Sequence, residues 1–180
     1  MLLVLASVAT FVFRFVLPSR AAWRYASILS NALQNARSVT LVEFQRDIVG
    51  PELVLSRIPA SPQQIAELRA ATGAWFAPVP PWRMKCFDPH HRVEIIRADG
   101  STLRFDICFH CQNFTLGDPH AVTMPDSWHD RLSRFFTSVG MPPRDDYSAL
   151  AKNHPDYHSV EEARRKLEEQ AQHLNNAPHK

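Results

Sequence analysis

The chain has 180 residues, a length that suits one globular domain with short appendages. Hydrophobic residues make up 45% and charged residues 21%, which is ordinary for a folded soluble protein and excludes disorder along the whole chain. No further long apolar runs follow the N-terminus, so a membrane protein with several spans is excluded as well. The 20 basic and 18 acidic residues nearly balance, and this charge gives no support for a nucleic-acid partner.

Residues 1–21 are expected to form a signal-like or membrane-tether segment. Residues 1–13, MLLVLASVATFVF, are apolar, and about a dozen such residues match the hydrophobic part of a signal peptide better than a bilayer span of about 20. Small residues near Ala21 offer a cleavage point. We therefore expect a location in the periplasm or cell envelope. Because no lysine or arginine precedes the apolar run, a buried first helix or a cytoplasmic protein is the alternative.

Residues 22–143 carry the pattern of one α+β domain. Its first half is expected to contain a helix over residues 21–36 and two strands, over residues 38–45 and 53–58, rich in β-branched and aromatic side chains. A proline-rich connector at residues 77–82 excludes a central strand there. Since helices and strand pairs alternate along the chain, we expect an antiparallel sheet with helices packed on it.

Two of the expected helices have clear signals at their ends. The residues at 61–64, Ser-Pro-Gln-Gln, predict a capping box with proline in the first turn, and the helix should end at Gly73. The later helix is expected to be capped by Asp126 and to end at Gly140. Its apolar residues share one face, which is typical of core packing: Trp128, Leu132, Phe135, Phe136 and Val139.

Residues 144–180 are expected to form a charged C-terminal helix. A second capping box, at residues 159–162, opens a segment rich in Glu, Arg, Lys and Gln. The apolar residues of this segment form only a thin line: Val160, Ala163, Leu167 and Leu174. The helix is therefore expected either to lie solvated on the domain or to bind a protein partner.

Residues 86–111, CFDPHHRVEIIRADGSTLRFDICFHC, contain a predicted β-hairpin with a three-residue loop at 98–100. This register creates two complementary charge pairs on one face: Glu94 with Arg104, and Arg92 with Asp106. A two-residue turn would shift the pairing by one and set Val93 opposite Asp106. The three-residue loop is therefore favoured.

The register also brings thiols and imidazoles from two segments to the open end of the hairpin. These are Cys86, His90, His91, Cys108 and Cys111. Zn²⁺ prefers four nitrogen or sulfur ligands, and three cysteines with one histidine are a standard structural set. We expect such a site here, with His90 favoured by the register because it lies across from Cys108.

Two other interpretations of the cysteines stay open. Cys108 and Cys111 can form a thiol–disulfide pair, with Cys86 free or as a resolving partner, and export would favour this because oxidising compartments stabilise disulfides. Alternatively, the cysteines are ordinary buried core residues. The other histidines are expected at the surface, including His120, His129, His154 and His158.

The motif Cys86-Phe-Asp-Pro-His-His91, followed by a hairpin and Ile107-Cys-Phe-His-Cys111, resembles one found in small uncharacterised bacterial proteins. Those proteins carry C-[FY]-x-P-x-H and I-C-F-x-C and often have an export or lipoprotein signal. The resemblance covers roughly residues 38–140 and implies no established activity. It marks Cys86, Pro89, His91, Cys108 and Cys111, and so favours His91 over His90. No cysteine ends the apolar N-terminus here, unlike in the lipoprotein versions.

The function expected from the sequence is therefore non-enzymatic. A closed site of four protein ligands would be structural, because catalysis needs an open position for water. The alternative is a thiol–disulfide redox protein that uses Cys108 and Cys111 with Cys86, its attacking thiolate favoured by neighbouring basic side chains.

Overall fold

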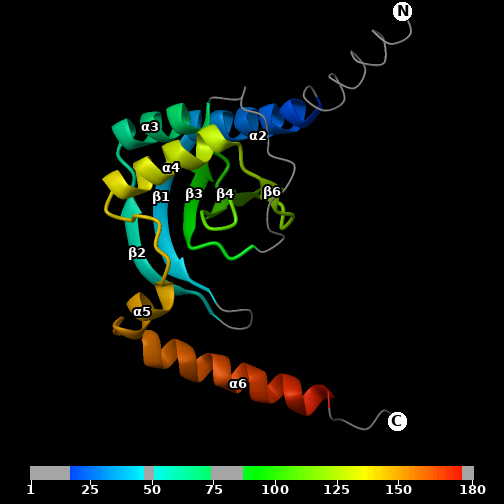
Figure 1. Ribbon diagram of the computed structural model, residues 1–180, viewed down its shortest axis with the longest axis vertical. Coiled ribbons are helices and arrows are strands. Elements are labelled where there is room, and N and C mark those ends of the chain that lie inside the picture. Colours follow the sequence, from blue (N-terminus) through cyan, green and yellow to red (C-terminus); the bar gives the residue numbers. More distant parts are fainter. Residues whose placement is uncertain (1–16, 47–50, 74–86, 176–180) are drawn as a thin grey trace, which may run out of the picture.

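The computed structural model describes residues 17–46, 51–73 and 87–175 (Figure 1). A six-stranded antiparallel sheet has the strand order β2-β1-β3-β4-β5-β6. Its strands are β1 (Ala36–Gln45), β2 (Leu53–Pro59), β3 (His91–Arg97), β4 (Thr102–Cys108), β5 (Asn113–Leu116) and β6 (Val122–Thr123). The helices are α2 (Leu17–Gln34), α3 (Pro62–Thr72), α4 (Asp126–Ser138), α5 (Tyr147–Lys152) and α6 (Tyr157–Asn175). The expected α+β class, with an antiparallel sheet and a helical C-terminal segment, is confirmed.

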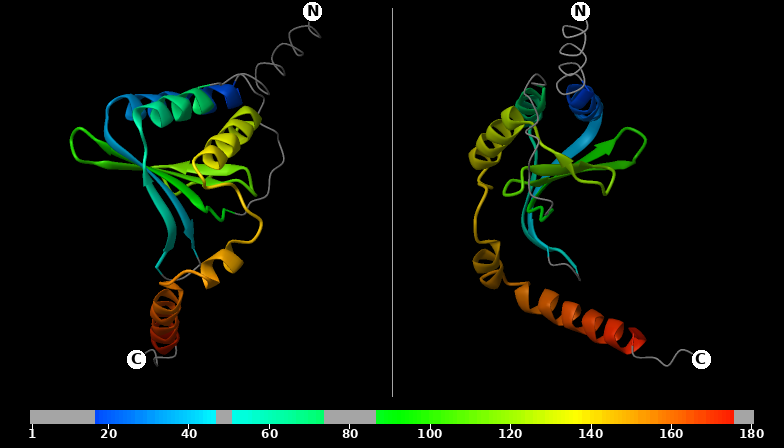
Figure 2. Two further views of the ribbon diagram at one scale, coloured as in Figure 1. Left: turned by 90° about the vertical axis from the view of Figure 1, so that its left-hand side faces the viewer. Right: turned by 45° about the vertical axis from the view of Figure 1, so that its right-hand side comes forward.

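The helices α2, α3 and α4 lie together over one face of the sheet (Figures 1 and 2). Alternate residues of the strands face them, because successive side chains of a strand point to opposite faces. Fully buried side chains from both layers form the core: Leu29, Leu41, Leu68, Val93, Ile95, Phe105, Trp128 and Phe136. The removal of this apolar surface from water is the main force that holds the helices on the sheet.

The helix ends follow the sequence signals in part. The predicted capping box of α3 is confirmed, since Gln64 N donates to Ser61 Oγ at 3.2 Å and Ser61 N donates to Gln64 Oε1 at 2.8 Å. The expectation that Asp126 caps α4 is wrong: the cap position is Pro125, and Asp126 is already the first helical residue. The predicted end is confirmed, because Gly140 has φ of 83° and Met141 N donates to the Phe136 carbonyl.

The structure adds elements that the sequence pattern did not separate. Strand β5 follows β4 through a tight turn and pairs with it, and the short β6 completes that edge of the sheet. The helix α2 begins at Leu17, before the expected start at residue 21. The six-residue α5 is capped by Asp146, whose carboxylate accepts from Ala149 N at 2.9 Å.

Helix α6 extends away from the sheet (Figure 2). It begins at Tyr157, so the predicted start at the 159–162 box is wrong; the Ser159 hydroxyl donates to the Asp156 carbonyl and caps nothing. Residues 165–172 are all exposed, and Leu167 is 44% exposed. Ion pairs within the helix stabilise this part, for example Glu162 with Lys166 at 2.8 Å. Binding of a partner by α6 stays a prediction.

Residues 1–16 and the 77–82 connector lie outside the described residues. Of the helices in the described ranges, none is long and apolar enough to cross a membrane. The expected export, the membrane tether and the division into segments 1–21, 22–143 and 144–180 stay predictions.

Candidate functional site

The predicted hairpin register is confirmed. Arg92 pairs with Asp106 and Glu94 with Arg104 across β3 and β4. The loop at residues 98–100 is closed by hydrogen bonds between Arg97 and Ser101 and between Gly100 and Arg97, and Gly100 takes φ of 83°. The open end of the hairpin therefore carries four of the residues that the sequence singled out: His90, His91, Cys108 and Cys111.

The two cysteines of β4 and its following turn lie side by side. The turn at residues 109–112 joins β4 to β5, and Cys111 N donates to Cys108 Sγ at 3.3 Å. Gln112 has φ of 52°, a left-handed conformation that glycine adopts most easily. Turns that bind a metal often have a glycine at this place. Here a glutamine adopts the left-handed backbone conformation.

The two cysteines differ in chemical state. Cys111 is disulfide-bonded, whereas Cys108 is a free thiol that is only 1% exposed. Cys108 and Cys111 are therefore not bonded to each other. Cys86 lies outside the described residues.

His91 is buried on the face that the helices cover. Its Nε2 donates to the Met141 carbonyl at 2.9 Å, and its ring packs edge-on against Phe109 and Phe136. Burial lowers the pKa of His91 to about 3, and the nearby charges of His90 and Arg144 act in the same direction. The imidazole is therefore neutral at pH 7, with its proton on Nε2.

His90 occupies the opposite side of the strand from His91. Its Nδ1 donates to the Phe44 carbonyl at 3.1 Å, and its Nε2 lies 3.4 Å from Asp88 Oδ2. The ring stacks on Tyr147 with 3.8 Å between centroids and 13° between planes. Both nitrogens of His90 thus already have polar neighbours.

The structure brings Cys108 and Cys111 together, but it separates the two histidines by the alternation of the strand. Within residues 17–46, 51–73 and 87–175, no group of three or more His, Cys, Asp or Glu side chains could hold a metal ion. That set does not contain Cys86, so the predicted zinc site of Cys86, Cys108, Cys111 and a histidine stays a prediction. The surface placement expected for His120 and His158 is confirmed, while His129 and His154 are partly buried.

The sequence pattern missed a group of residues that covers this end of the sheet. Glu43 is buried opposite His91 on β1, and Arg144 Nε donates to its Oε1 at 3.0 Å. The Tyr147 hydroxyl accepts from Arg144 N at 3.3 Å, and burial raises the pKa of Tyr147. Glu43 lies in a strand of apolar residues, and this buried acid position was the one available signal in the sequence.

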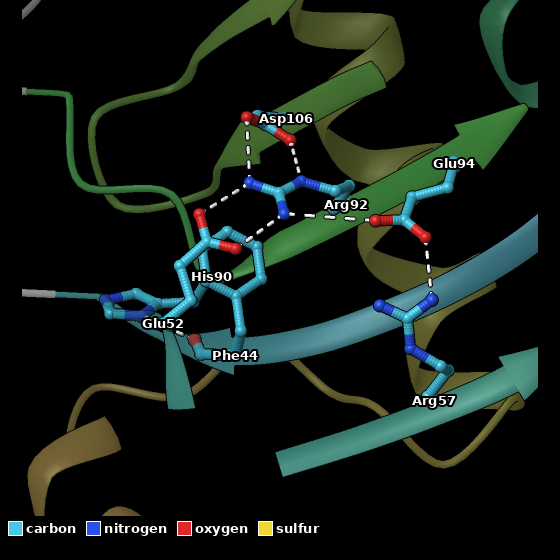
Figure 3. Close-up of polar contacts among 7 residues, drawn as sticks. All are labelled: Phe44, Glu52, Arg57, His90, Arg92, Glu94 and Asp106. Atoms are coloured by element: carbon cyan, nitrogen blue, oxygen red, sulfur yellow. Dashed lines mark hydrogen bonds and ion pairs between the residues drawn. The ribbon is translucent and has the colours of Figure 1, made fainter. Parts of the chain in front are cut away.

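A second buried charge lies on the sheet face opposite the helices (Figure 3). Arg92, with 4% of its side chain exposed, binds Glu52 through two nitrogens at 2.6 and 2.8 Å and Asp106 at 2.5 Å. Its guanidinium also lies 4.5 Å from the centre of the Phe44 ring. Burial opposes the charge of Arg92, but these hydrogen bonds outweigh it and raise the pKa. The register predicted Asp106 as a partner but not Glu52, which comes from the segment before β2.

Comparison with known proteins adds no assignment: no family model, no curated protein and no solved structure matches the chain.

Proposed function

We propose that this chain is an exported, non-enzymatic protein whose α+β domain is held at the end of the β3–β4 hairpin by a structural cysteine cross-link. The observation that carries the proposal is the state of the cysteines: Cys111 is disulfide-bonded and Cys108 is free. The chain has three cysteines, so we assign Cys86 as the partner of Cys111. The bond would tie the segment before β3 to the turn after β4 and would stabilise the domain by about 2–5 kcal/mol.

Export is part of this proposal because disulfides persist in oxidising compartments and are rare in the cytosol. The apolar segment of residues 1–13 agrees with it. The location proposed is the periplasm or cell envelope.

A zinc site built from the same residues is the second candidate. Two observations favour it: Cys111 N donates to Cys108 Sγ, and Gln112 adopts the left-handed conformation typical of metal-binding turns. The Nε2 of His91 donates to a backbone carbonyl, as ligand histidines commonly do, which would leave its Nδ1 for the metal. The ligands would be Cys86, Cys108, Cys111 and either His91 or His90.

A redox function for Cys108 and Cys111 receives less support. A reactive thiol is partly exposed and lies in electropositive surroundings. Cys108 is only 1% exposed and its sulfur accepts from Cys111 N of the turn that follows, so a protein substrate would not reach this sulfur.

One set of measurements separates the three roles. The protein is purified without reductant, and its metal content, free thiols and intact mass are determined before and after denaturation. The proposed cross-link gives no zinc, no reactive thiol in the folded protein, one thiol after denaturation, and a Cys86–Cys111 peptide in the non-reducing digest. One equivalent of zinc with three thiols after chelation would replace the cross-link with the metal site. A Cys108–Cys111 peptide that forms and breaks reversibly with glutathione would replace it with the redox role.

Export is tested separately by fusing residues 1–30 to a reporter enzyme that is active only after disulfide formation outside the cytosol. Reporter activity supports the proposal. An inactive reporter, with the full-length protein found in the cytosol, would contradict it.

A further inference from the structure

The sheet face opposite α2, α3 and α4 carries an open basin with a volume of about 960 Å³. It lies between the end of β1, the segment just before β3, the β4–β5 pair and the first turn of α5. This volume is at the upper end of the range for pockets that bind small organic molecules. Neither Cys108 nor Cys111 lines the basin, and the inference drawn from it does not depend on the function proposed above.

The acidic side chains of the basin all have basic neighbours. Asp106 binds Arg92, Asp118 binds His120, and Asp88 lies 3.4 Å from His90. The hydrogen bonds from His120 lower the pKa of Asp118, so this carboxylate is ionised and already engaged. These three contacts use part of the hydrogen-bonding capacity of Asp106, Asp118 and Asp88, so less of it is available to a ligand.

The two arginines of the basin are different. The side chains of Arg46 and Arg104 are exposed and make no hydrogen bond or ion pair with any residue in the described part of the chain. Each guanidinium can bind a carboxylate or phosphate group through two parallel hydrogen bonds. The cations that remain available in the basin are therefore suited to an anion.

The two guanidiniums act on the same region. The hydrogen bonds from Arg92 lower the pKa of Glu52, and the charges of Arg46 and Arg104 lower it further. Arg46 follows β1 and Arg104 lies on β4, so residues far apart in the sequence contribute positive charge around one carboxylate. Both guanidiniums line the basin, so each would attract an anionic ligand bound there.

Other residues that line the basin could bind hydroxyl groups and the apolar face of a sugar ring. Gln45 also lines the basin, and its Oε1 atom is buried without a hydrogen-bond partner among the residues that the structure describes. Thr115 and Ser148 supply hydroxyl groups, and Phe87 supplies an aromatic ring.

From these observations we propose that the basin binds a hydroxylated organic anion, of the size of a sugar acid or a sugar phosphate. Arg46 and Arg104 bind the anionic group, and the Gln45 amide with the Ser148 hydroxyl binds the hydroxyls. The anionic group can be a carboxylate or a phosphate, because a guanidinium forms paired hydrogen bonds with either.

The test is calorimetric titration of the full-length protein at low ionic strength with glucuronate, glucose 6-phosphate, glucose and inorganic phosphate. At least one of the two hydroxylated anions should bind with a dissociation constant of about 1 mM or lower, and both glucose and inorganic phosphate at least about tenfold more weakly. Which anion binds more tightly identifies the source of the charge. Binding should weaken as salt is added, because the guanidiniums are exposed.

The variants Arg46→Gln and Arg104→Gln should each weaken binding about tenfold, and the double variant should abolish it. Arg37→Gln is the matched control, because Arg37 is an exposed arginine at the opposite end of the same strand, β1. Amide chemical shifts of Gly117 and Ser148 should move on titration and those near Arg37 should not. Equal binding of all four probes, equal binding by the double variant, or no binding at about 10 mM would overturn the proposal.

Discussion

Glu43 and His91 face each other across β1 and β3, and both are held by the segment that joins α4 to α5. Arg144 of that segment donates to the Glu43 carboxylate, and the Met141 carbonyl accepts from His91. The segment thus covers the two buried polar side chains at this end of the sheet. Its removal would leave the side chain of Glu43 and the imidazole N–H of His91 without these partners in the core.

Replacement of Arg144 tests whether the segment between α4 and α5 stabilises the fold through Glu43. Arg144→Ala leaves the buried carboxylate of Glu43 without its cation, and because Arg144 is itself partly exposed we expect a loss of about 1–3 kcal/mol in the free energy of unfolding. Arg165→Ala is the control, because its pair with Glu169 is exposed on α6 and contributes less than about 0.5 kcal/mol. Urea unfolding at pH 7 measures both. Equal midpoints for the two variants would show that the Glu43–Arg144 pair does not hold the segment.

The buried histidine predicts a pH dependence of stability. The folded pKa of His91 is lowered to about 3, while in the unfolded chain it is near the ordinary value of about 6.5. Below pH 6.5 the histidine therefore binds a proton in the unfolded state but not in the folded state. The free energy of unfolding falls as the pH falls towards 3. The slope from this group is about 1.4 kcal/mol per pH unit.

His91→Gln removes this titration and keeps a side-chain N–H that can donate to the Met141 carbonyl. Between pH 7 and pH 5 the unmodified protein should lose about 2 kcal/mol more than the variant, measured by urea unfolding at both values. Acidic groups contribute equally to both proteins, so the difference isolates the histidine. If the two proteins lose the same amount, His91 is not a buried neutral residue.

Gln112 should be a site where glycine stabilises the protein. Its φ of 52° strains an L-residue, and glycine adopts this conformation without that cost. We expect Gln112→Gly to raise the free energy of unfolding by about 0.5–1 kcal/mol and Gln112→Val to lower it by at least about 1 kcal/mol. Thermal unfolding ranks the three proteins. A less stable glycine variant would mean that the glutamine side chain makes a contact worth more than the strain.

Arg92 should be among the most costly charged residues to replace. Arg92→Leu leaves Glu52 and Asp106 without their shared cation in a partly buried place, and we expect a loss of about 3–5 kcal/mol in the free energy of unfolding. The matched variant is Arg57→Leu, because Arg57 is half-exposed on β2 and binds Glu94, and its loss should cost about 1 kcal/mol or less. Denaturant unfolding at pH 7 compares them. Similar losses would mean that Arg92 contributes no more than a surface ion pair.

Much of the local structure followed from the sequence. The 98–100 loop, the register and the Arg92–Asp106 pair were predicted correctly, because a register shift of one residue would have placed Asp106 opposite an apolar side chain. Glu94 lies opposite Arg104 as predicted, but its carboxylate pairs with Arg57 of β2. The α3 cap and the glycine that ends α4 were also predicted, since both depend on residues within a few positions of each other. The weaker signal at residues 159–162 failed, because nothing local prevents α6 from beginning two residues earlier, at Tyr157.

The sequence by itself determined most of the longer helices and strands, the hairpin register and the closeness of Cys108 and Cys111, since these follow from short-range sterics and the period of the strand. Only the tertiary structure decided which groups surround them: Glu52 on Arg92, Arg144 on Glu43, and Met141 on His91. Each of these partners lies at least 40 positions away along the chain. A buried charge needs a hydrogen-bonding or charged partner, and the packing of the helices on the sheet decides which side chain is near enough to serve. A short stretch of sequence does not contain that information.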